Sequence, residues 1–462
     1  MSEDGLKAAE AKMREAGQPE EAIRNFASAY RRLVRDETAM LPSAELEPAS
    51  DVDELENLPD PAPDADAGAL GRVAVIKLNG GLATTMGLRS PKSLVEARDG
   101  RSFLDIIVGN TLALRKRDGV RLPLVLMNSQ STRSDTMRAL ESHPALDAGL
   151  PVHFLQSMEP KLDAESLAPV SWPPNPALEW CPPGHGDVYS SLRSSGMLDA
   201  LLEHGFRYAM ISNADNLGAT PDARIAGHLE HGEIPFLMEV VEGTEADRKG
   251  GHIARRRADG QLVLRETAQT PPEDEESFRD YRRWRYYNTN SVWVDLSALK
   301  EKLDQTGGVL ELPLIVNHKT VDPRDSSSPP VIQLETAMGA AIGSFKDAQL
   351  LCVPRSRFVP VKTTDDLLVL RSDVYTLSDE LVVSAVPERV GNLPYVELDP
   401  AFYKLLDEFE KRFPHGAPSL READRLVVHG DVTFGDGVHV RGAVELDVDQ
   451  PTQIDAGTTL EP

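Results

Sequence analysis

Short apolar stretches alternate with helical stretches between residues 73 and 241, and this alternation constrains the fold more than any other feature. Strands that alternate with helices predict a mostly parallel sheet with helices on both of its faces. The Asp259-Gly260 pair is typical of a tight turn, so we also expect an antiparallel hairpin in this region. The chain is therefore predicted to be an α/β protein. The expected strands lie near 73–78, 122–127, 152–155, 207–212 and 235–241, and the expected helices near 102–117, 132–141, 188–203 and 221–230.

The first expected strand leads into a Gly-rich loop that ends in a lysine. Residues 78–92 read Leu-Asn-Gly-Gly-Leu-Ala-Thr-Thr-Met-Gly-Leu-Arg-Ser-Pro-Lys. Glycines let backbone N–H groups face an anion, and Lys92 adds a mobile positive charge, so the loop favours phosphate binding. The spacing fits neither a P-loop nor a dinucleotide-binding fingerprint. The alternative is a Gly-rich β–α turn that binds no ligand.

The length and composition of the chain limit the molecules that it can bind and the compartment in which it works. A chain of 462 residues has room for about three domains, and its net charge of −25 disfavours nucleic acids and anionic membranes, because such a surface repels phosphates outside local basic pockets. No apolar stretch approaches membrane-spanning length, and the first residues resemble no targeting peptide. Cys181 and Cys352 cannot make a disulfide framework, so we expect a cytoplasmic protein.

The two ends of the chain differ from this central region. Residues 6–37 carry two helical patterns, the second over 19–36, and 45–66 contain nine acidic residues and no basic one. We interpret 45–66 as a solvated linker, with a nucleic-acid mimic as the alternative.

Apolar residues recur every six positions near the C-terminus, which predicts a parallel β-helix, with a β-meander as the alternative. The two apolar series are Leu426, Val432, Val438, Val444 and Val428, Phe434, Val440, Leu446.

Polar clusters follow several of the expected strands. The segment 79–81 follows the first strand, Gln156 follows the third and 213–216 follows the fourth. Ligands of open parallel sheets bind outside the carboxyl ends of the strands, so we expect these clusters to meet in one cleft. Asp215 would be the natural magnesium ligand, since its hard oxygen donor can share the ion with nucleotide phosphates; its alternative role is to cap the next loop.

Residues 182–187 read Pro-Pro-Gly-His-Gly-Asp, which predicts a rigid turn before a helix. Gly184 and Gly186 permit close backbone approach, and Asp187 is placed to cap the helix. His185 is interpreted as a hydrogen-bond donor to a sugar or a phosphate, with a structural imidazole as the alternative.

Three later segments are also candidates for ligand binding. The amides of 288–290 suit sugar hydroxyls but equally suit an Asx turn. Glu335, at the start of an expected Ala/Gly-rich helix over 335–344, would bind a sugar hydroxyl or cap that helix. The segment 354–364 brings Arg355, Arg357 and Lys362 together, which indicates a phosphate target, with surface ion pairs as the alternative.

About a dozen short motifs occur in one order between Val73 and Leu446: 77–82, 91–94, 103–105, 126–129, 182–187, 212–213 with 215–220, 249–251, 288–290, 332–337, 354–358 and 360–364. In this combination they resemble the UTP–glucose-1-phosphate uridylyltransferases (UDP-glucose pyrophosphorylases) of the eukaryotic type. The resemblance implies conversion of UTP and glucose 1-phosphate to UDP-glucose and pyrophosphate, with Mg²⁺ as cofactor. It also implies a helical N-terminal extension and acidic linker (1–68), a Rossmann-like nucleotidyltransferase domain with a mixed, mostly parallel sheet (69–380), and a C-terminal domain with a short left-handed β-helix (381–462).

The resemblance also implies roles for individual residues. The implied UTP-binding residues are Leu78, Asn79, Gly80, Gly81, Lys92, Gln156, Gly184, Asp215 and Lys362. The implied sugar-phosphate-binding residues are His185, Asn213, Ala214, Gly251, Asn288, Asn290 and Glu335. Asp215 would hold the metal, and Lys92 and Lys362 would be the catalytic cations. In-line attack of a phosphate oxygen on the α-phosphorus needs two anions held together and their charge neutralised, so no nucleophilic side chain is required.

The sequence departs from the family pattern at a few positions. Ala83 stands where the loop usually has a third glycine, which would strain the loop if that position needs a positive φ. Residues 88–90 read Leu-Arg-Ser in place of Cys-Lys-Gly. The hexads end earlier than is usual in the family, so the sequence leaves open whether the protein is a homo-oligomer.

Three alternative functions remain at this point. A related uridylyltransferase would use another hexose 1-phosphate, such as a galactose or N-acetylhexosamine phosphate. A non-catalytic sugar-nucleotide sensor predicts loss of Lys92, Asp215 or Lys362, and all three are present. An acyltransferase is suggested by the hexads alone, which contain His429 and His439 but no dedicated catalytic histidine.

Overall fold

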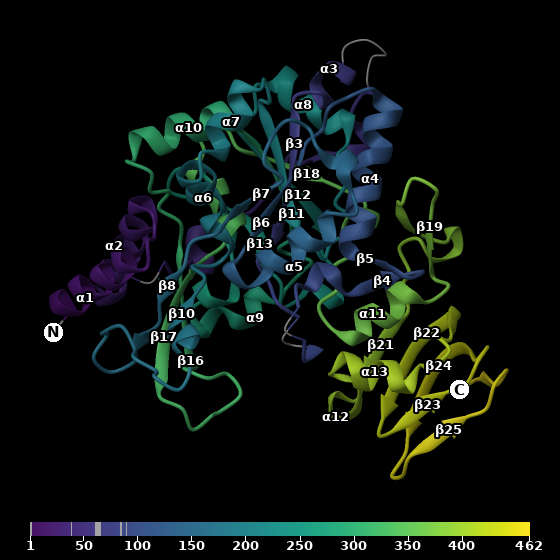
Figure 1. Ribbon diagram of the computed structural model, residues 1–462. Helices are drawn as coiled ribbons and strands as arrows, with labels where there is room; N and C mark the ends of the chain where they lie inside the picture. The colour runs from purple at the N-terminus through teal and green to yellow at the C-terminus, as the bar shows by residue number, and fades with distance from the viewer. Residues whose placement is uncertain (1, 38, 61–65, 84–85, 89) are drawn as a thin grey trace.

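A mixed, mostly parallel sheet lies at the centre of the computed structural model, which describes residues 2–37, 39–60, 66–83, 86–88 and 90–462 (Figure 1). Along its main path only β15 is antiparallel to its neighbours, and the other adjacent strands are parallel. The α/β prediction is confirmed. The strand order is β2 (Asp53–Glu54), β18 (Gln349–Cys352), β12 (Phe236–Glu242), β15 (Tyr286–Asp295), β11 (Tyr208–Asn213), β3 (Val73–Asn79), β6 (Leu124–Asn128) and β7 (His153–Leu155).

The five strands expected from the apolar pattern are all present, with ends shifted by one or two residues. They read as nearly continuous apolar runs because helices cover both faces of the sheet, so neither side of a strand meets water. The helices that cover the sheet are α4 (Phe103–Asp118), α5 (Gln130–Leu140), α6 (Val188–Ser194), α7 (Met197–Glu203), α8 (Ala223–Gly232) and α10 (Leu296–Gln305).

Local signals explain where these helices begin and end. Ser102 and Asp105 form a capping box at the start of α4, and Gly119 ends the helix in the left-handed region at φ 67°. The single helix expected over 188–203 is instead two helices. Gly196 separates them, because its φ of 75° cannot continue a right-handed helix.

The acidic segment 45–66 is only partly the solvated linker that its composition predicted. Its strand β1 (Leu46–Pro48) pairs with β13, and β2 forms the edge of the central sheet beside β18. Leu46 and Leu55 are buried, and their burial against the sheet holds this charged segment in place. The part of the prediction that concerns 61–65 lies outside the described residues.

The predicted hairpin is confirmed: β13 (His252–Arg256) and β14 (Leu262–Arg265) are antiparallel, and Gly260 has a φ of 71° in the turn. Both N-terminal helices, α1 (Ser2–Glu15) and α2 (Glu20–Val34), are also present. Phe26 and Tyr30 of α2 pack on Leu314 of β16 (Leu314–Thr320) and Leu334 of β17 (Pro330–Thr336). The helical extension therefore lies against the sheet that β9 (Leu162–Asp163) completes.

The C-terminal strands stack in parallel, as Figure 1 shows at the yellow end of the chain. Leu426 pairs directly with Val444, and Val428 with Leu446, so the hexad brings apolar residues into register on successive strands. A β-meander would pair neighbouring strands antiparallel and is therefore excluded here. The strands are β21 (Tyr395–Leu398), β22 (Ser419–His429), β24 (His439–Asp447) and β26 (Thr459–Leu460) in one stack, and β23 (Val432–Phe434) and β25 (Thr452–Ile454) in another.

Shorter elements complete the fold: α3 (Asp66–Leu70), β4 (Glu96–Arg98), β5 (Arg101–Ser102), β8 (Glu159–Pro160), β10 (Trp180–Cys181), α9 (Glu275–Phe278), α11 (Thr364–Arg371), β19 (Tyr375–Leu377), β20 (Val383–Ala385), α12 (Pro400–Tyr403) and α13 (Leu406–Arg412). Within the described ranges, no helix has both the length and the apolar character needed to span a bilayer.

Candidate active site

The predicted binding residues converge on one edge of the central sheet. The strands β3, β6, β7 and β11 are parallel, so the residues that follow them emerge at the same edge. Strand β15 runs the other way, and Ser291 pairs with Ser212 near the end of β11. Residues 288–290 therefore lie beyond the end of β11, beside the 213–216 segment.

Gln156 lies directly over Gly80 at this edge. A Cβ atom on Gly80 would come within 2.6 Å of Gln156 Oε1, so the side chain of Gln156 occupies the space that only glycine leaves. The backbone N–H of Gln156 donates to the carbonyl of Asn128 at 2.8 Å, which fixes where this side chain begins. Gly81 is exposed, with open space around its Cα.

Asn79 does not present its side chain to a ligand. The side chain is buried, and its Nδ2 donates to Asn128 Oδ1 at 2.7 Å and to Thr136 Oγ1 at 2.9 Å. If Asn79 contacts UTP as predicted, it does so through its backbone atoms. Leu78 is half-buried, and its carbonyl accepts from the N–H of Ala214 at 3.2 Å, which joins the loops after β3 and β11.

Lys92 closes the Gly-rich loop and faces the loop after β11. Its backbone N–H donates to the carbonyl of Gly81 at 3.2 Å, and its Nζ donates to Asp215 Oδ2 at 2.8 Å. The two side chains are 19% and 21% exposed, so the pair remains accessible to a ligand. A cation and a carboxylate from two different loops therefore meet at the predicted position of the phosphates.

Asp215 fits a magnesium ion by the chemistry of its donor atoms. In the part of the chain that the structure describes, no three His, Cys, Asp or Glu side chains form a metal-binding cluster. A divalent ion at Asp215 would thus take most of its ligands from phosphates and water, which is how Mg²⁺ is commonly bound.

The predicted cationic segment 354–364 supplies fewer available cations than expected. Arg355 pairs with Asp247. Arg357 is buried and pairs with both carboxylate oxygens of Glu239 at 2.7 Å. These two arginines form ion pairs within the protein, as the alternative interpretation expected, so the phosphate-target interpretation now depends on Lys362.

Lys362 is the exposed cation of this segment. The N–H of the preceding Val361 donates to the carbonyl of Asp215 at 3.2 Å, so Lys362 lies next to the acidic loop. The structure thus places both predicted catalytic residues beside the same loop, Lys92 through its side chain and Lys362 through the backbone of its neighbour Val361.

The 182–187 turn requires its glycines. Gly184 has a φ of 81°, and a Cβ there would come within 2.5 Å of the carbonyl oxygen of Thr336. Asp187 does not cap α6, contrary to the prediction, since its Oδ2 accepts from the Ser157 N–H at 2.7 Å and from Ser191 Oγ at 2.6 Å. Burial raises the pKa of Asp187 to about 6.

His185 is held in one tautomer by the backbone. Its Nδ1 accepts from the N–H of Met338 at 2.9 Å, and burial lowers its pKa to about 4. At neutral pH the ring is therefore uncharged and carries its proton on Nε2. This agrees with the predicted donor role of His185.

The predicted hexose-binding residues lie around an irregularity in β15. The pairing of β12 with β15 shifts between Glu239 and Val240, which leaves Thr289 and Asn290 as extra residues in the strand. Asn290 has a φ of 54°, and Asn288 Nδ2 donates to Asn290 Oδ1 at 2.9 Å. The N–H of Asn290 also donates to Asn288 Oδ1 at 2.9 Å, so the alternative Asx turn is present and lies within this bulge.

Glu335 and Gly251 complete the predicted set. The expected helix over 335–344 is wrong: Glu335 belongs to β17, and a 3₁₀ helix follows over Met338–Ser344. Glu335 therefore caps no helix, and its Oε1 lies 3.6 Å from Lys319 Nζ. Gly251 lies against Glu266, whose carboxylate would be 2.7 Å from an added Cβ.

Ala83 does not strain the Gly-rich loop. It is absent from the residues with positive φ, and its N–H donates to the carbonyl of Ser90 at 3.2 Å. The buried position 83 thus accepts a methyl group in ordinary backbone geometry. Arg89, in the second departure from the family pattern, lies outside the described residues.

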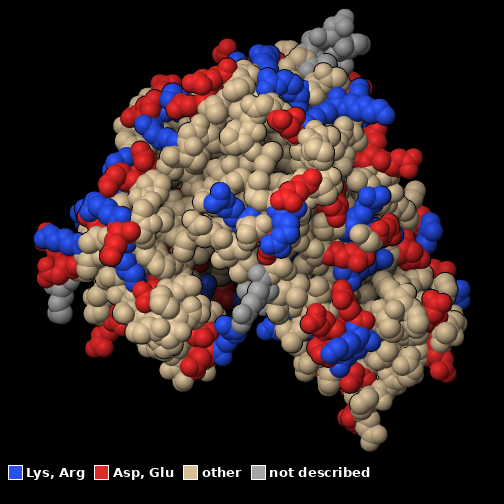
Figure 2. All heavy atoms as spheres, viewed as in Figure 1, with Lys and Arg blue, Asp and Glu red and all other residues tan. Residues whose placement is uncertain are grey.

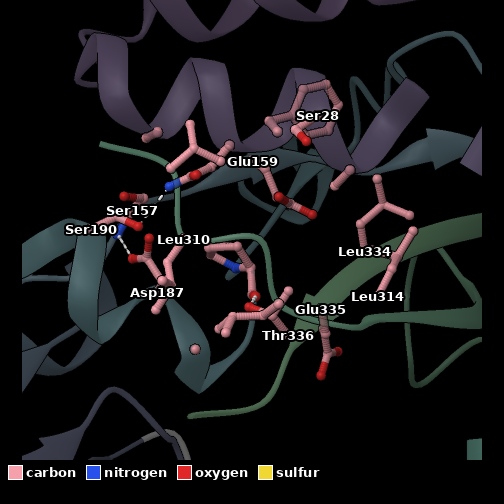
Figure 3. A pocket seen from close by; sticks show the side chains of 18 of the residues that line it. Ser28, Ser157, Glu159, Asp187, Ser190, Leu310, Leu314, Leu334, Glu335 and Thr336 are labelled. Carbon is pink, nitrogen blue, oxygen red and sulfur yellow. Dashed lines mark hydrogen bonds between the residues drawn. The ribbon is translucent and has the colours of Figure 1, made fainter. Parts of the chain in front are cut away.

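A separate cavity of about 60 Å³ lies between α2 and the 182–187 turn (Figure 3). The carboxylate of Glu159 points into it, and within the described chain its Oε1 has no hydrogen-bond partner. Burial, with the nearby Asp187, raises the pKa of Glu159 well above its ordinary value. Its lining includes Ser157, which follows β7, and Glu335, so the cavity borders one of the predicted sugar-phosphate-binding residues.

Two charged residues of the site region escaped sequence reasoning. Lys77 and Glu239 lie within the apolar strands β3 and β12 and are almost fully buried. A charged residue inside an otherwise apolar parallel strand was the signal that would have found them, because such a residue is rarely buried without a partner. On the face drawn in Figure 2, both signs of charge are mixed, and the surface is notched between the part that carries β16 and β17 and the C-terminal strands.

An open, mostly parallel sheet with a Gly-rich loop, a lysine and an acidic loop at its carboxyl edge defines a nucleotidyltransferase-like α/β protein. The family model described as UTP–glucose-1-phosphate uridylyltransferase matches residues 23–441. The chain belongs to this family.

Individual relatives agree with this membership. The UTP–glucose-1-phosphate uridylyltransferase of Hordeum vulgare is 40% identical over 449 residues, which cover 96% of this chain and 92% of the relative. A crystal structure of UDP-glucose phosphorylase from Trypanosoma brucei has a TM-score of 0.92 and 41% identity, and covers 99% of this chain and 98% of that one. A Leishmania major UDP-glucose pyrophosphorylase mutant in complex with UDP-glucose has a TM-score of 0.91 and 42% identity, with 98% of each chain covered.

Proposed function

We propose that the carboxyl edge of the central sheet carries out the reaction of the family: transfer of the uridylyl group of UTP to glucose 1-phosphate, giving UDP-glucose and pyrophosphate. Family membership over nearly the whole chain supports the reaction. One observation supports the location of the reaction. Lys92 Nζ lies 2.8 Å from Asp215 Oδ2, and this contact joins the Gly-rich loop to the acidic loop.

UTP would lie along the Gly-rich loop. Gln156, seated over Gly80, would read the uracil base, and Gly184 would let the backbone approach the ribose. The backbone N–H groups of 78–81 would face the phosphates, and Lys92 would neutralise the pyrophosphate as it leaves.

Glucose 1-phosphate would lie between the turn at 182–187 and the bulge in β15. The Nε2–H of His185 would donate to its phosphate, with the ring fixed by its bond from Met338. Asn213, Ala214, Gly251, Asn288, Asn290 and Glu335 would surround the hexose. Lys362, beside Asp215, would balance the negative charge of the two phosphates as they approach in line.

Asp215 would hold the Mg²⁺ ion, which supplies charge neutralisation at the phosphates when it is bound. The protein contributes the remaining requirements, because Lys92, Lys362 and the loop N–H groups bring two anions together. No nucleophilic side chain takes part in this scheme, since the phosphate oxygen of the sugar is itself the nucleophile.

We also propose the domain boundaries, the handedness of the C-terminal coil and the cellular compartment. We assign 1–68 to an N-terminal extension, 69–380 to the catalytic domain and 381–462 to the C-terminal domain, and we assign a left-handed sense to the C-terminal coil. We also assign the protein to the cytoplasm, to which the two buried free cysteines, Cys181 and Cys352, are suited.

Pyrophosphate release from UTP tests the proposal directly. The assay compares glucose 1-phosphate with galactose 1-phosphate and N-acetylglucosamine 1-phosphate, each with and without Mg²⁺. We expect Mg²⁺-dependent release that is fastest with glucose 1-phosphate. Preference for another sugar would identify a related uridylyltransferase, and UTP binding without release would identify a sugar-nucleotide sensor.

A further inference from the structure

Four buried polar residues form one row across adjacent strands, just below the ligand edge. Lys77 of β3 pairs with Ser212 of β11, Ser212 with Ser291 of β15, and Ser291 with Glu239 of β12. All four are 3% exposed or less. The next row on the same face of the sheet, two residues further down each strand, has the hydrophobic residues Val75, Met210, Trp293 and Leu237 in register.

A buried charge is costly unless it is paired, so this row needs partners. Lys77 finds two: its Nζ donates to Ser212 Oγ at 2.7 Å and to the carbonyl oxygen of Ala219 at 2.7 Å. These two acceptors flank the segment 213–218 that carries Asp215. The side chain of Lys77 therefore joins the two ends of the acidic loop at its base.

Arg357 holds the next residue of the same loop. It donates to the carbonyl oxygen of Thr220 at 2.8 Å while both oxygens of Glu239 accept from it at 2.7 Å. The successive carbonyls of Ala219 and Thr220 thus accept from two different buried cations. Glu239 also accepts from Trp293 Nε1 at 2.8 Å, so the carboxylate is held on several sides.

The two hydrogen bonds that Lys77 donates to Ser212 and Ala219 do not require its positive charge. Burial, and then the Arg357 guanidinium, lower the pKa of Lys77 to about 7, whereas Glu239 and Asp215 oppose this change. A neutral amine still has two N–H groups, which is enough for the two acceptors. The loop is held through this geometry at any pH near neutrality.

We propose that Lys77 is a positioning residue that fixes Asp215 for metal binding by tying Ser212 to Ala219 at the base of the acidic loop. This inference rests on the proposed function, in which Asp215 is the metal ligand. Loss of the tie would let the loop shift relative to Lys92 and the phosphates. A displacement of about 1 Å at a reacting centre is enough to slow catalysis by about 100-fold.

Replacement Lys77→Met tests the proposal, because methionine keeps much of the side-chain length and removes both hydrogen bonds. We expect kcat to fall by about 10- to 100-fold and the Mg²⁺ concentration for half-maximal activity to rise, with the KM for UTP changed much less. The matched control is Ser291→Ala in the same row, since Ser291 Oγ has no partner among the described residues. The control should retain wild-type kcat and Mg²⁺ dependence.

A purely structural role would lower the unfolding temperature and kcat but leave the Mg²⁺ requirement unchanged, and that result overturns the proposal. If Lys77→Met does not fold, Ser212→Ala removes one of the two acceptors and should shift the Mg²⁺ requirement in the same direction; an unchanged requirement again overturns it.

Binding of Mn²⁺ in the presence of UTP separates this inference from the proposed function. Electron paramagnetic resonance measures that affinity without turnover. Weaker Mn²⁺ binding by Lys77→Met supports the positioning role even if no sugar phosphate is a substrate. Equal binding by wild type and variant contradicts it even if the wild type is fully active.

Discussion

The Nζ atom of Lys92 lies 2.8 Å from Oδ2 of Asp215, so the cation that ends the Gly-rich loop is paired with the carboxylate of the loop after β11. Both side chains are partly exposed. Without ligand, each side chain compensates the charge of the other, and an arriving metal and triphosphate would replace that compensation. The two side chains that we propose to contact the metal and the phosphates are thus already paired in the structure.

Substitution of either proposed catalytic cation should affect turnover far more than folding. We expect Lys92→Ala and Lys362→Ala to lower kcat by about 100-fold or more, because in the proposed function each removes a charge that neutralises the phosphates at the reacting centre. Steady-state pyrophosphate release measures this, and thermal unfolding should stay close to wild type. The control is Lys116→Ala, an exposed lysine of α4. Full turnover by either variant would contradict the assignment.

Gly80→Ala should weaken UTP binding without unfolding the protein. The added methyl group would come within 2.6 Å of Gln156 Oε1, and the flexible end of Gln156 can move away at the expense of its position over the loop. We expect the KM for UTP to rise by about 10-fold or more, which corresponds to about 1.4 kcal/mol. Gly343→Ala is the matched control, because its Cβ would meet Leu262 O at an ordinary 3.6 Å. Equal effects of the two substitutions would show that the position of the Gln156 side chain over Gly80 does not matter for UTP binding.

Arg357→Met should destabilise the catalytic domain strongly. It leaves Glu239, which has no exposed surface, as an unpaired buried carboxylate, at a cost of about 3–5 kcal/mol. The double variant Arg357→Met/Glu239→Gln should recover part of this loss, since the remaining group is then neutral. Urea unfolding of the wild type, both single variants and the double variant measures the coupling. Additive effects would show that the pair is not energetically linked.

His252→Phe should reduce acid sensitivity. The ring of His252 is fully buried and stacks on Trp284 at 4.9 Å, and burial lowers its pKa to about 3. Between pH 6.5 and 3 the unfolded chain binds a proton that the folded protein does not, so stability is complete above pH 6.5 and falls as pH decreases. By pH 5 this loss is about 2 kcal/mol, from about 1.4 kcal/mol per pH unit.

The phenylalanine variant lacks this titration. Between pH 7.5 and 5.0 its unfolding temperature should therefore fall by about 2 °C less than that of the wild type, since a chain of this length shifts by about 1 °C per kcal/mol. The exposed His415, replaced by Gln, serves as the control and should respond to pH as the wild type does. An identical response of His252→Phe and wild type would show that His252 does not carry the effect.

Much of the fold could be predicted because apolar runs in a buried parallel sheet are long and distinct. The five strands and the hairpin at Asp259-Gly260 follow from local pattern alone. Composition misled at 45–66, since two buried leucines, Leu46 and Leu55, outweigh the surrounding charge and dock the segment on the sheet. The 335–344 helix was mispredicted because close packing and not helix propensity determines the conformation of that segment.

The convergence of the candidate residues could be predicted from the sequence, but the buried residues that hold them could not. Strand ends located Gln156 and Asp215, because topology brings such positions together. Partner choice is a tertiary property, so the pairing of Arg357 with Glu239 and the burial of Asn79 could not be seen in the sequence. For the same reason Asp187 was misassigned as a helix cap, whereas its side chain accepts from Ser157, which follows β7, and from Ser191 inside α6.

The edge strand β2 has a consequence for behaviour at high concentration. An uncovered sheet edge offers unpaired N–H and C=O groups on which a second molecule can add a strand, and this is a route to aggregation. Here β18 is covered by a two-residue strand whose side chains, Asp53 and Glu54, are exposed and negatively charged. Like charges on approaching molecules repel at that edge, so the acidic segment protects the sheet from intermolecular strand pairing.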